Sequence, residues 1–595
     1  MRRLMDPHSC ARPEEAAVEH LTLDLTVDFD RRTIAGRAVL RVARRPGAAR
    51  LLLDTRDLEV RRVTLGEGGG PARFELGAGG PPLGRPLAIE LAPGTRTVEI
   101  EYEAAPSAAA VQWLEPRQTA GGQHPFLFTQ SQAILARTWV PCQDTPGVRM
   151  TYDAIVRVPR GLLAVMSAEN PTARAADGVH RFRMPQAVPS YLLALAVGDL
   201  EFRSLGPRTG VYAEPATVAR AAHEFSETER MIDAAEKLYG PYLWGRYDLL
   251  VLPPSFPFGG MENPRLTFAT PTILAGDRSL TSLVAHELAH SWSGNLVTNA
   301  TWNDFWLNEG FTVYFERRIM EELHGRPYAE MLALLGLQDL RACVKDKGAT
   351  SADTRLLLDL AGRDPDEAVN EIAYEKGHSF LRLLEEAVGR EAFDGFLREY
   401  FERHRFRSMT TGAFLEHLRA RLLAGRPGLE ERLGVDEWLH GTGLPANCPE
   451  PRSDAFLKVD RQVEAWKAGT RAGDLVTKGW STHEWLHFLR QLPDPIAPAR
   501  LADLDAAFQL TTSGNSEVLN AWFPHAIAAR WEPAMAALER FLLSQGRRKF
   551  LKPLYKKLAE TPEGLERARR IYEKARPGYH SVSTGTIDGI LGVKA

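Results

Sequence analysis

The sequence predicts a multidomain α+β protein with a β-sheet domain first, a mixed but helix-dominated domain next, and an all-helical domain last. Apolar and polar residues alternate with a period of two in much of the first 200 residues. From about Ala213 the period becomes that of a helix, and a Pro-rich stretch at 444–454 precedes a series of amphipathic helices. A chain of 595 residues is long enough for about three or four domains of ordinary size.

The N-terminal sheet domain is expected over residues 1–203. In "HLTLDLTVDF" the apolar side chains occupy every second position, which is typical of a strand with one buried face. Shorter runs follow in "RAVLRVARR", "ARLLLD" and "TRTVEIEYEA", and the Gly/Pro-rich residues 66–86 are expected to form turns. The domain is expected to end near "SYLLALAVGDLEFRS".

The central domain is expected over residues 204–443 and the C-terminal domain over residues 455–595. Residues 216–240 have a helical period that ends at Gly240 and Pro241, and "YDLLVLPP" predicts a short strand. Residues 444–454 fit a linker. After it come "NSEVLNAWFPHAIAARW", "EPAMAALERFLLSQG", "RKFLKPLYKKLAE" and "GLERARRIYEKA", which predict stacked helices of solenoid type without a strict repeat.

Composition narrows the class of protein. The net charge is −3 and no basic stripe is visible, so nucleic acid is not an expected partner. No apolar run reaches the roughly 18 residues of a membrane span, and the N-terminus lacks the apolar region of a secretory signal. We therefore expect a cytoplasmic protein. We also expect a monomer. The cysteines are too few and too dispersed for a disulfide framework or a cysteine zinc site: Cys10, Cys142, Cys343 and Cys448.

The stretch "VAHELAHSWSG" contains the pattern His-Glu-x-x-His. Apolar residues around it recur with helical spacing, so His286 and His290 project from the same side of one helix, about one turn apart. Two imidazoles so placed can bind one zinc ion, and Glu287 between them is available as a base. The pattern alone is also compatible with an amphipathic helix that carries two histidines by chance.

A second helix supplies a third candidate ligand. Glu309 follows His290 by nineteen residues and lies in the helical stretch "TWNDFWLNEGFTVYFERRI". Two histidines and one glutamate leave the fourth zinc position open for water, which is the arrangement of a catalytic rather than a structural zinc. We therefore expect one Zn²⁺ per chain.

Upstream lies "PFGGMENPRLTF". Gly259 and Gly260 have no Cβ, so a substrate backbone could approach closely and pair edge-on with the chain. Glu262 follows at once, and a fixed carboxylate beside a zinc ion could bind a free α-ammonium, which only a chain end provides. The simpler alternative for "GGMEN" is a glycine turn with a solvated glutamate.

These motifs together resemble the zinc aminopeptidases of family M1, in particular the leukotriene A(4) hydrolase and aminopeptidase B-like branch. The stretches "VPCQDTPGVRMTYDA", "YDLLVLPPSFPFGGMENPRLTFATPT", "FWLNEGFTVYFER", "AYEKG" and "QGRRKFLKPLYKKLA" resemble that branch in the same order. The resemblance covers almost the whole chain. It implies a saddle-like β domain, a thermolysin-like catalytic domain and an armadillo- or HEAT-like C-terminal solenoid.

The resemblance also implies a role for each residue that matches a family motif. It makes His286, His290 and Glu309 the zinc ligands and Glu287 the general base. Tyr374, in "IAYEKG", matches the tyrosine that donates a hydrogen bond to the developing oxyanion. The substrate-binding residues that it implies are Gln132 and Glu262 at the substrate amine, Gly259, Gly260 and Met261 along the substrate, Arg547 and Lys549 at its carboxylate, and Asp366.

A site with charge at both ends favours di- and tripeptides, with the amine at Glu262 and the carboxylate at Arg547. Without the resemblance, the "RRK" cluster around Arg547 reads as solvated surface. The leukotriene enzymes have a second tyrosine five residues before the catalytic one, where this chain has Val369. Asp366, which matches the carboxylate associated with epoxide opening, is present. Because Val369 replaces the second tyrosine, we expect peptide hydrolysis to dominate and epoxide hydrolysis to be weak or absent.

Two alternatives remain, a bifunctional peptidase and epoxide hydrolase, and a non-catalytic scaffold that binds peptides or proteins. The scaffold is disfavoured because no catalytic group of the family pattern is missing. The pattern does not identify the groups that orient the zinc histidines. Thermolysin-like sites often place a carboxylate four residues after the ligand glutamate, and here that residue is Val313.

Overall fold

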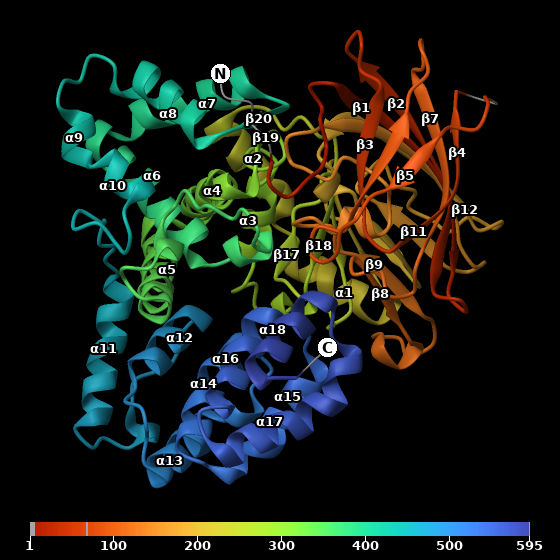
Figure 1. Cartoon of the computed structure of the whole chain (residues 1–595). Helices are drawn as coiled ribbons and strands as arrows, with labels where there is room; N and C mark the ends of the chain where they lie inside the picture. The colour runs from red at the N-terminus through yellow and green to blue at the C-terminus, as the bar shows by residue number, and fades with distance from the viewer. Residues whose placement is uncertain (1–5, 67–68, 594–595) are drawn as a thin grey trace.

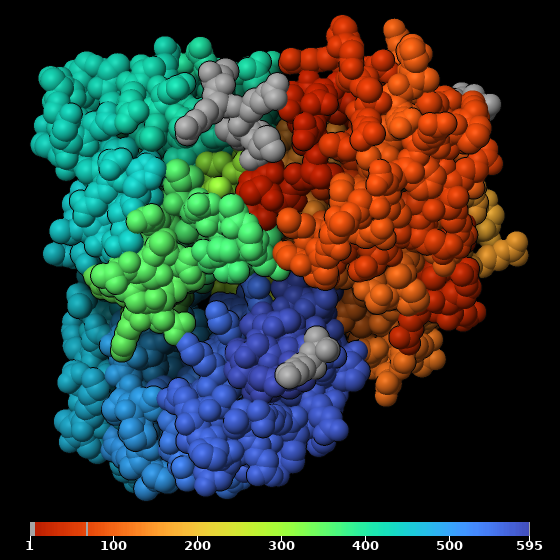
Figure 2. Space-filling view, viewed as in Figure 1, coloured from red at the N-terminus to blue at the C-terminus, as the bar shows by residue number. Residues whose placement is uncertain are grey.

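The computed structural model describes residues 6–66 and 69–593 and has the three predicted parts (Figure 1). Strands of the N-terminal part lie on one side, a mixed central part lies beside them, and the C-terminal helices lie against both (Figure 2). The first five residues and residues 67–68, on which part of the N-terminal and turn predictions fell, lie outside the described ranges. The fold class expected from the sequence is therefore confirmed.

The N-terminal part is built on a six-stranded sheet in the order β12-β10-β1-β2-β7-β4. Leu21, Leu23 and Leu25 on β1 are completely buried, which confirms the period of two. The strands of this sheet are β1 (Ala16–Asp28), β2 (Thr33–Arg44), β4 (Leu58–Leu65), β7 (Thr97–Ala104), β10 (Met150–Arg157) and β12 (Val179–Val188). Two smaller sheets join β11 (Leu163–Met166), β13 (Leu195–Gly198), β9 (Phe126–Thr129) and β8 (Val111–Leu114), and β3 (Arg50–Thr55), β6 (Arg85–Glu90) and β5 (Phe74–Leu76).

The central part begins with a five-stranded sheet in the order β14-β15-β16-β18-β17. Its strands are β14 (Glu201–Ser204), β15 (Thr209–Ala213), β16 (Tyr247–Val251), β17 (Gly260–Met261) and β18 (Leu266–Ala269). The short strand β17 runs antiparallel to β18 and forms one edge of the sheet, next to α3 (Figure 1). Residue 203 lies inside β14, so we propose that the central domain begins with this strand.

The helix expected over residues 216–240 is two helices, and the prediction of one continuous helix was wrong. The chain turns at Phe225, and the Thr228 hydroxyl bonds back to the Phe225 carbonyl as the second helix begins. The helices of the central part are α1 (Pro215–Glu224), α2 (Thr228–Tyr239), α3 (Ser282–Ala289), α4 (Trp306–His324), α5 (Arg326–Lys347), α6 (Gly377–Val388), α7 (Arg390–His404), α8 (Thr411–Leu418), α9 (Leu429–Leu433) and α10 (Val435–His440), and β19 (Val297–Asn299) pairs with β20 (Arg407–Met409).

The C-terminal helices have a hydrophobic core of their own. They pack in a chain of neighbours, α11 on α12, α12 on α14, α14 on α16 and α16 on α18, as expected for stacked helix pairs. Residues 444–453 contain no helix, in agreement with a linker. No helix in the described ranges is both long and apolar enough to span a bilayer. The helices are α11 (Asp454–Lys467), α12 (Thr482–Gln491), α13 (Pro498–Phe508), α14 (Ser516–Ala528), α15 (Met535–Ser544), α16 (Arg548–Leu558), α17 (Pro562–Ala575) and α18 (Ser581–Leu591).

Candidate metal centre and active site

The three predicted ligands meet where α3 packs on α4. Val284 and Leu288 bury one face of α3, which leaves the two histidines on the side toward α4. Glu309 Oε2 lies 3.4 Å from His286 Nε2 and 3.5 Å from His290 Nε2. The structure therefore brings together the three side chains that were predicted as ligands.

The other nitrogen of each imidazole already has a partner. His286 Nδ1 lies 3.1 Å from Glu316 Oε2, and His290 Nδ1 lies 3.0 Å from the Ser293 carbonyl. These contacts leave Nε2 of both rings free to bind a metal. Glu316 was not predicted from the sequence, because the expected position of an orienting carboxylate, four residues beyond Glu309, is Val313. The orienting carboxylate lies seven residues beyond, two turns along the same face of α4, and that spacing was the available signal.

The geometry of these side chains fits zinc. A tetrahedral ion with ligands at 2.0–2.1 Å places the ligand atoms roughly 3.3 Å apart, close to the separations of 3.4 and 3.5 Å that join Glu309 to the histidines. Glu309 Oε2 is buried and has no hydrogen-bond partner. A buried carboxylate oxygen without a partner is costly, and a cation between the three side chains would remove that cost.

Glu287 lies beside the metal ligands and in close contact with the edge strand β17. A Cβ on Gly260 would lie 2.2 Å from Glu287 Oε1 and 2.4 Å from its Cδ. The Glu287 side chain therefore fills the space that a side chain at Gly260 would need, a second reason for glycine beside the approach of substrate expected from the sequence. A Cβ on Gly259 would lie 2.6 Å from Arg547 Nη2 and 2.7 Å from Leu283 Cδ1, so both glycines are in tight contact with other parts of the site.

Glu262 follows directly after β17 and is held in place from two sides. Gln132 Nε2 donates to Glu262 Oε1 at 3.3 Å, and Asn295 Nδ2 donates to the Glu262 carbonyl at 2.7 Å. Met261 is buried, and its sulfur accepts a hydrogen bond from Gln130 at 3.2 Å. The structure thus brings Gln132 and Glu262 together as predicted, and it adds Asn295, which had no signal in the sequence.

Negative charge is concentrated at this site. Ligand atoms of Glu262, Glu287 and His290 all lie within 4.8 Å of one another. Burial, and then the carboxylates of Glu309 and Glu287, raise the pKa of Glu262 well above its usual value. Burial also raises the pKa of Glu287 to about 8. The buried carboxylates of Glu262, Glu287 and Glu309 repel one another when they are ionised. A metal ion on one side and a substrate ammonium on the other would neutralise this charge.

Tyr374 lies on a π-helical turn (Ile372–Lys376) just before α6. Its ring stacks on that of His286, with the centroids 6.0 Å apart. Burial, and then the carboxylates of Glu309 and Glu262, raise the pKa of the phenol well above its usual value, so the hydroxyl remains a proton donor.

The distance from α4 to the turn that carries Tyr374 is set by two glycines. A Cβ on Gly310 would lie 2.8 Å from the Gly377 Cα, and a Cβ on Gly377 would lie 2.8 Å from the Gly310 Cα. Gly310 adjoins the ligand Glu309, and Gly377 is three residues after Tyr374. The backbones of Gly310 and Gly377 are therefore in direct contact, with no side chain between them.

Arg547 comes to the site from the C-terminal part. The segment before α16 docks on the loop before β17, where Gly546 N–H donates to the Pro254 carbonyl at 2.8 Å and Arg548 N–H to the Pro257 carbonyl at 2.8 Å. Arg547 is only 6% exposed, and its Nη1 donates to Glu517 Oε1 at 3.2 Å. Lys549 Nζ donates to both oxygens of Glu517, at 3.0 and 2.9 Å. The "RRK" cluster is thus partly buried. Glu517, the carboxylate that pairs with Arg547 and Lys549, was not predicted from the sequence.

Asp366 lies on a 3₁₀ turn (Pro365–Ala368). Burial, and then Asp364, raise the pKa of its carboxyl to about 6, and Arg548 opposes this rise.

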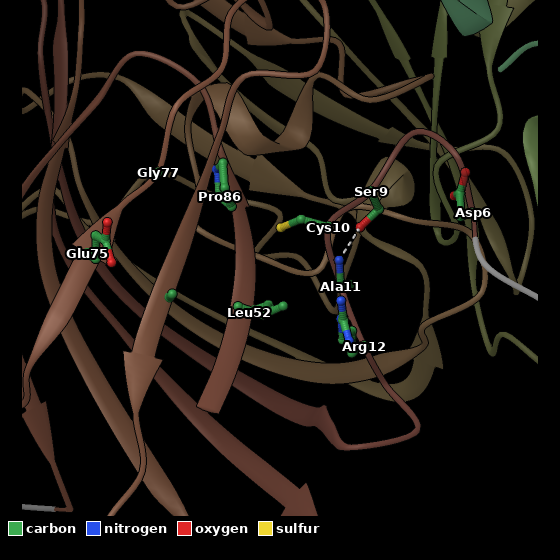
Figure 3. A pocket seen from close by; sticks show the side chains of 10 residues that line it. Asp6, Ser9, Cys10, Ala11, Arg12, Leu52, Glu75, Gly77 and Pro86 are labelled. Carbon is green, nitrogen blue, oxygen red and sulfur yellow. Dashed lines mark hydrogen bonds between the residues drawn. The ribbon is translucent and has the colours of Figure 1, made fainter. Parts of the chain in front are cut away.

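A hollow in the N-terminal part, drawn in Figure 3, lies away from these residues. The Cys10 thiol in it donates to the Leu53 carbonyl at 3.3 Å, and burial and Asp54 raise its pKa. A thiol so protonated is a poor nucleophile, and the hollow carries no catalytic constellation.

A helix pair that presents two histidines and a glutamate, with a buried carboxylate beside them and one metal position left for water, defines a zinc metallopeptidase. Comparison with known families gives three matches: the peptidase M1 N-terminal domain at residues 17–192, the peptidase family M1 domain at residues 223–434, and the leukotriene A4 hydrolase C-terminal domain at residues 480–591. The chain belongs to peptidase family M1 and is a zinc-dependent aminopeptidase.

Similar proteins extend over the whole chain. Leukotriene A-4 hydrolase of Xenopus laevis is 40% identical over 600 residues, which cover 98% of each chain. Leucine aminopeptidase 2 of Ajellomyces capsulatus is 34% identical over 605 residues, with 98% of this chain and 96% of the relative covered. Among solved structures, yeast LTA4 hydrolase in complex with bestatin has a TM-score of 0.90 at 33% identity and covers 100% of this chain and 98% of its own.

Proposed function

We propose that the enzyme removes the N-terminal residue from di- and tripeptides, with Glu262 and Gln132 holding the substrate ammonium. The observation that carries this proposal is the position of Glu262. Its carboxylate is buried, follows an edge strand directly, and lies within 4.8 Å of ligand atoms of Glu287 and His290. A carboxylate there pairs with a free amine and leaves no room for a preceding residue, so cleavage is confined to the first peptide bond.

In this proposal His286, His290 and Glu309 hold the metal, which when bound acidifies a water molecule and polarises the scissile carbonyl. Glu287 accepts the proton of the attacking water and passes it to the leaving amine. The hydroxyl of Tyr374 donates a hydrogen bond to the carbonyl oxygen as negative charge develops on it.

The preference for short peptides follows from the distance between the two ends of the site. Arg547 lies against Gly259, and Glu262 is three residues further along the same segment. Three residues of extended chain span roughly 10 Å, about the length of a tripeptide that pairs with this edge through Gly260 and Met261. The carboxylate of such a peptide would lie at Arg547, with Lys549 beside it.

Steady-state rates on a tripeptide, its C-terminal amide and a decapeptide with the same first residues test this preference. We expect kcat/KM to be highest for the free tripeptide, and the difference between acid and amide to disappear in Arg547→Ala. Equal efficiency on the decapeptide would contradict the preference for short substrates while leaving aminopeptidase activity intact.

A bifunctional enzyme is the second candidate, because the C-terminal domain matches that of leukotriene A4 hydrolase and Asp366 is present. Val369 replaces the second tyrosine, so we propose that epoxide hydrolysis is weak or absent. Incubation with leukotriene A4 tests this, and a dihydroxy product formed at a rate that rivals peptide cleavage would contradict it. We also propose a cytoplasmic location, supported by four free cysteines, and a monomer. Light scattering and cell fractionation test both points.

A further inference from the structure

The loop between α3 and β19 is bonded both to a metal ligand and to the residue proposed to bind the substrate amine. The backbone N–H of Asn295 donates to the His290 carbonyl at 3.0 Å, and its side-chain Nδ2 donates to the Glu262 carbonyl at 2.7 Å. Asn295 is buried, so both hydrogen bonds are shielded from water. The distance between the metal ligands and the Glu262 carboxylate therefore depends on where Asn295 lies.

Arg149, just before β10, binds this loop from the N-terminal part of the protein. Its Nη2 donates to the Asn295 carbonyl at 2.6 Å, and its Nη1 donates to the Thr298 hydroxyl at 2.5 Å. Nε and Nη2 also donate to the Ala187 carbonyl on β12, at 3.2 and 2.8 Å. The planar guanidinium thus holds the loop and the edge of the N-terminal sheet in one fixed geometry.

The oxygens that Arg149 binds are carbonyl and hydroxyl oxygens, and none of them belongs to a carboxylate. Burial lowers the pKa of Arg149 to about 10, so the side chain keeps its charge at neutral pH. Removing a cation from water without a paired carboxylate costs stability, so a stabilising ion pair does not explain this arginine. Its charge-assisted hydrogen bonds to the loop indicate instead that it orients Asn295.

We propose that Arg149 is a positioning residue for recognition of the substrate amine. It holds Asn295, and through it Glu262, at a set distance from the metal ligand His290, and it does not touch the substrate. Loss of the guanidinium frees the Asn295 carbonyl, and the Glu262 carboxylate then no longer meets the ammonium with the same geometry. The N-terminal sheet is in this way part of the active site. This inference rests on the proposed binding of the substrate ammonium at Glu262.

Binding of two hydroxamates to the zinc-loaded enzyme tests the inference. Leucine hydroxamate carries the α-amine, isocaproyl hydroxamate has the same side chain without it, and titration calorimetry gives the Kd of each. The second Kd divided by the first measures recognition of the amine alone. In Arg149→Met we expect this ratio to fall roughly 10-fold, because the charged hydrogen bond at Glu262 loses its geometry. The Kd of isocaproyl hydroxamate and the zinc content should stay unchanged.

Two further variants complete the experiment. Arg149→Lys keeps the charge but cannot reach all three oxygens, so its ratio should lie between those of the wild type and Arg149→Met. It decides the question where Arg149→Met does not fold. The matched control is Arg85→Met, which also removes an arginine that binds two backbone carbonyls of the N-terminal part, those of Leu76 and Gly77, and should leave the ratio unchanged.

A wild-type ratio in Arg149→Met, or in Arg149→Lys where only that variant folds, would overturn the inference. An equal loss of affinity for both hydroxamates would also overturn it, since a merely structural role affects both alike. Failure of the proposed function is seen separately in Glu262→Ala, which should lose the preference for the amine. A wild-type ratio in that variant would contradict binding of the ammonium at Glu262.

Discussion

Replacing Gly260 with alanine tests whether the edge strand positions the general base. The new Cβ would lie 2.2 Å from Glu287 Oε1, 2.4 Å from Cδ and 2.6 Å from Cγ, all far below van der Waals contact. The backbone of Gly260 does not have a positive φ, so alanine introduces no backbone strain and acts only through this contact. Either the Glu287 carboxylate or β17 must move by roughly 1 Å.

A misplacement of this size lowers the rate about 100-fold when the group acts in the transition state. We therefore expect kcat of Gly260→Ala on an aminoacyl-p-nitroanilide to fall by about two orders of magnitude. Bound zinc, measured by mass spectrometry of the purified protein, should stay at one per chain because the substitution does not touch His286, His290 or Glu309.

The matched control is Gly395→Ala on α7, where a Cβ meets no atom within 4 Å. This variant should have wild-type kcat. If Gly260→Ala also retained wild-type kcat with full zinc, the contact between strand and base would have no catalytic importance, and our explanation of the glycine would be wrong.

Three further predictions concern the same region. Glu287→Gln should lower kcat by about 10²- to 10⁴-fold while zinc stays bound, as seen by metal analysis; wild-type kcat would exclude this residue as the base. Glu316→Gln should weaken zinc binding about 10- to 100-fold in chelator competition, since His286 loses its orienting partner; an unchanged affinity would refute that role. The folded pKa of Asp366 is raised to about 6, so its ionisation destabilises the fold above that pH and not below about pH 4. Asp366→Asn should therefore raise the Tm at pH 8 but not at pH 4, and an equal shift at both would contradict this assignment.

Local patterns predicted the fold, and they predicted three candidate metal ligands that the structure brings together. The alternation in β1 and the helical period of α3 and α4 depend on neighbours in the sequence, and the structure confirms them. The break between α1 and α2 at Phe225 was not predicted, because the residues around it have a helical composition. The first helix, α1, packs on β15, whereas α2 packs on α3 and α4, so the position of the break depends on tertiary contacts.

Contacts across elements were the part that the sequence could not supply. Glu517 is thirty residues from Arg547 and on another helix, so no spacing rule connects them. Asn295 holds the backbone of Glu262 from a loop beyond the zinc motif. The contact between Gly260 and Glu287 was not predicted for the same reason, because Glu287 belongs to a different element.

The contact between Gly310 and Gly377 limits how this enzyme can diverge. No side chain separates the two backbones, so a substitution at either glycine cannot bring Glu309 and Tyr374 closer together. Any larger residue would push α4 and the turn that carries Tyr374 apart. A pocket of different width, for a different substrate, therefore requires substitutions in the opposite wall, which β17 and the segment before α16 form. That wall is joined to the C-terminal helices, so new substrate preferences can be selected there without disturbing the distance on which the chemistry depends.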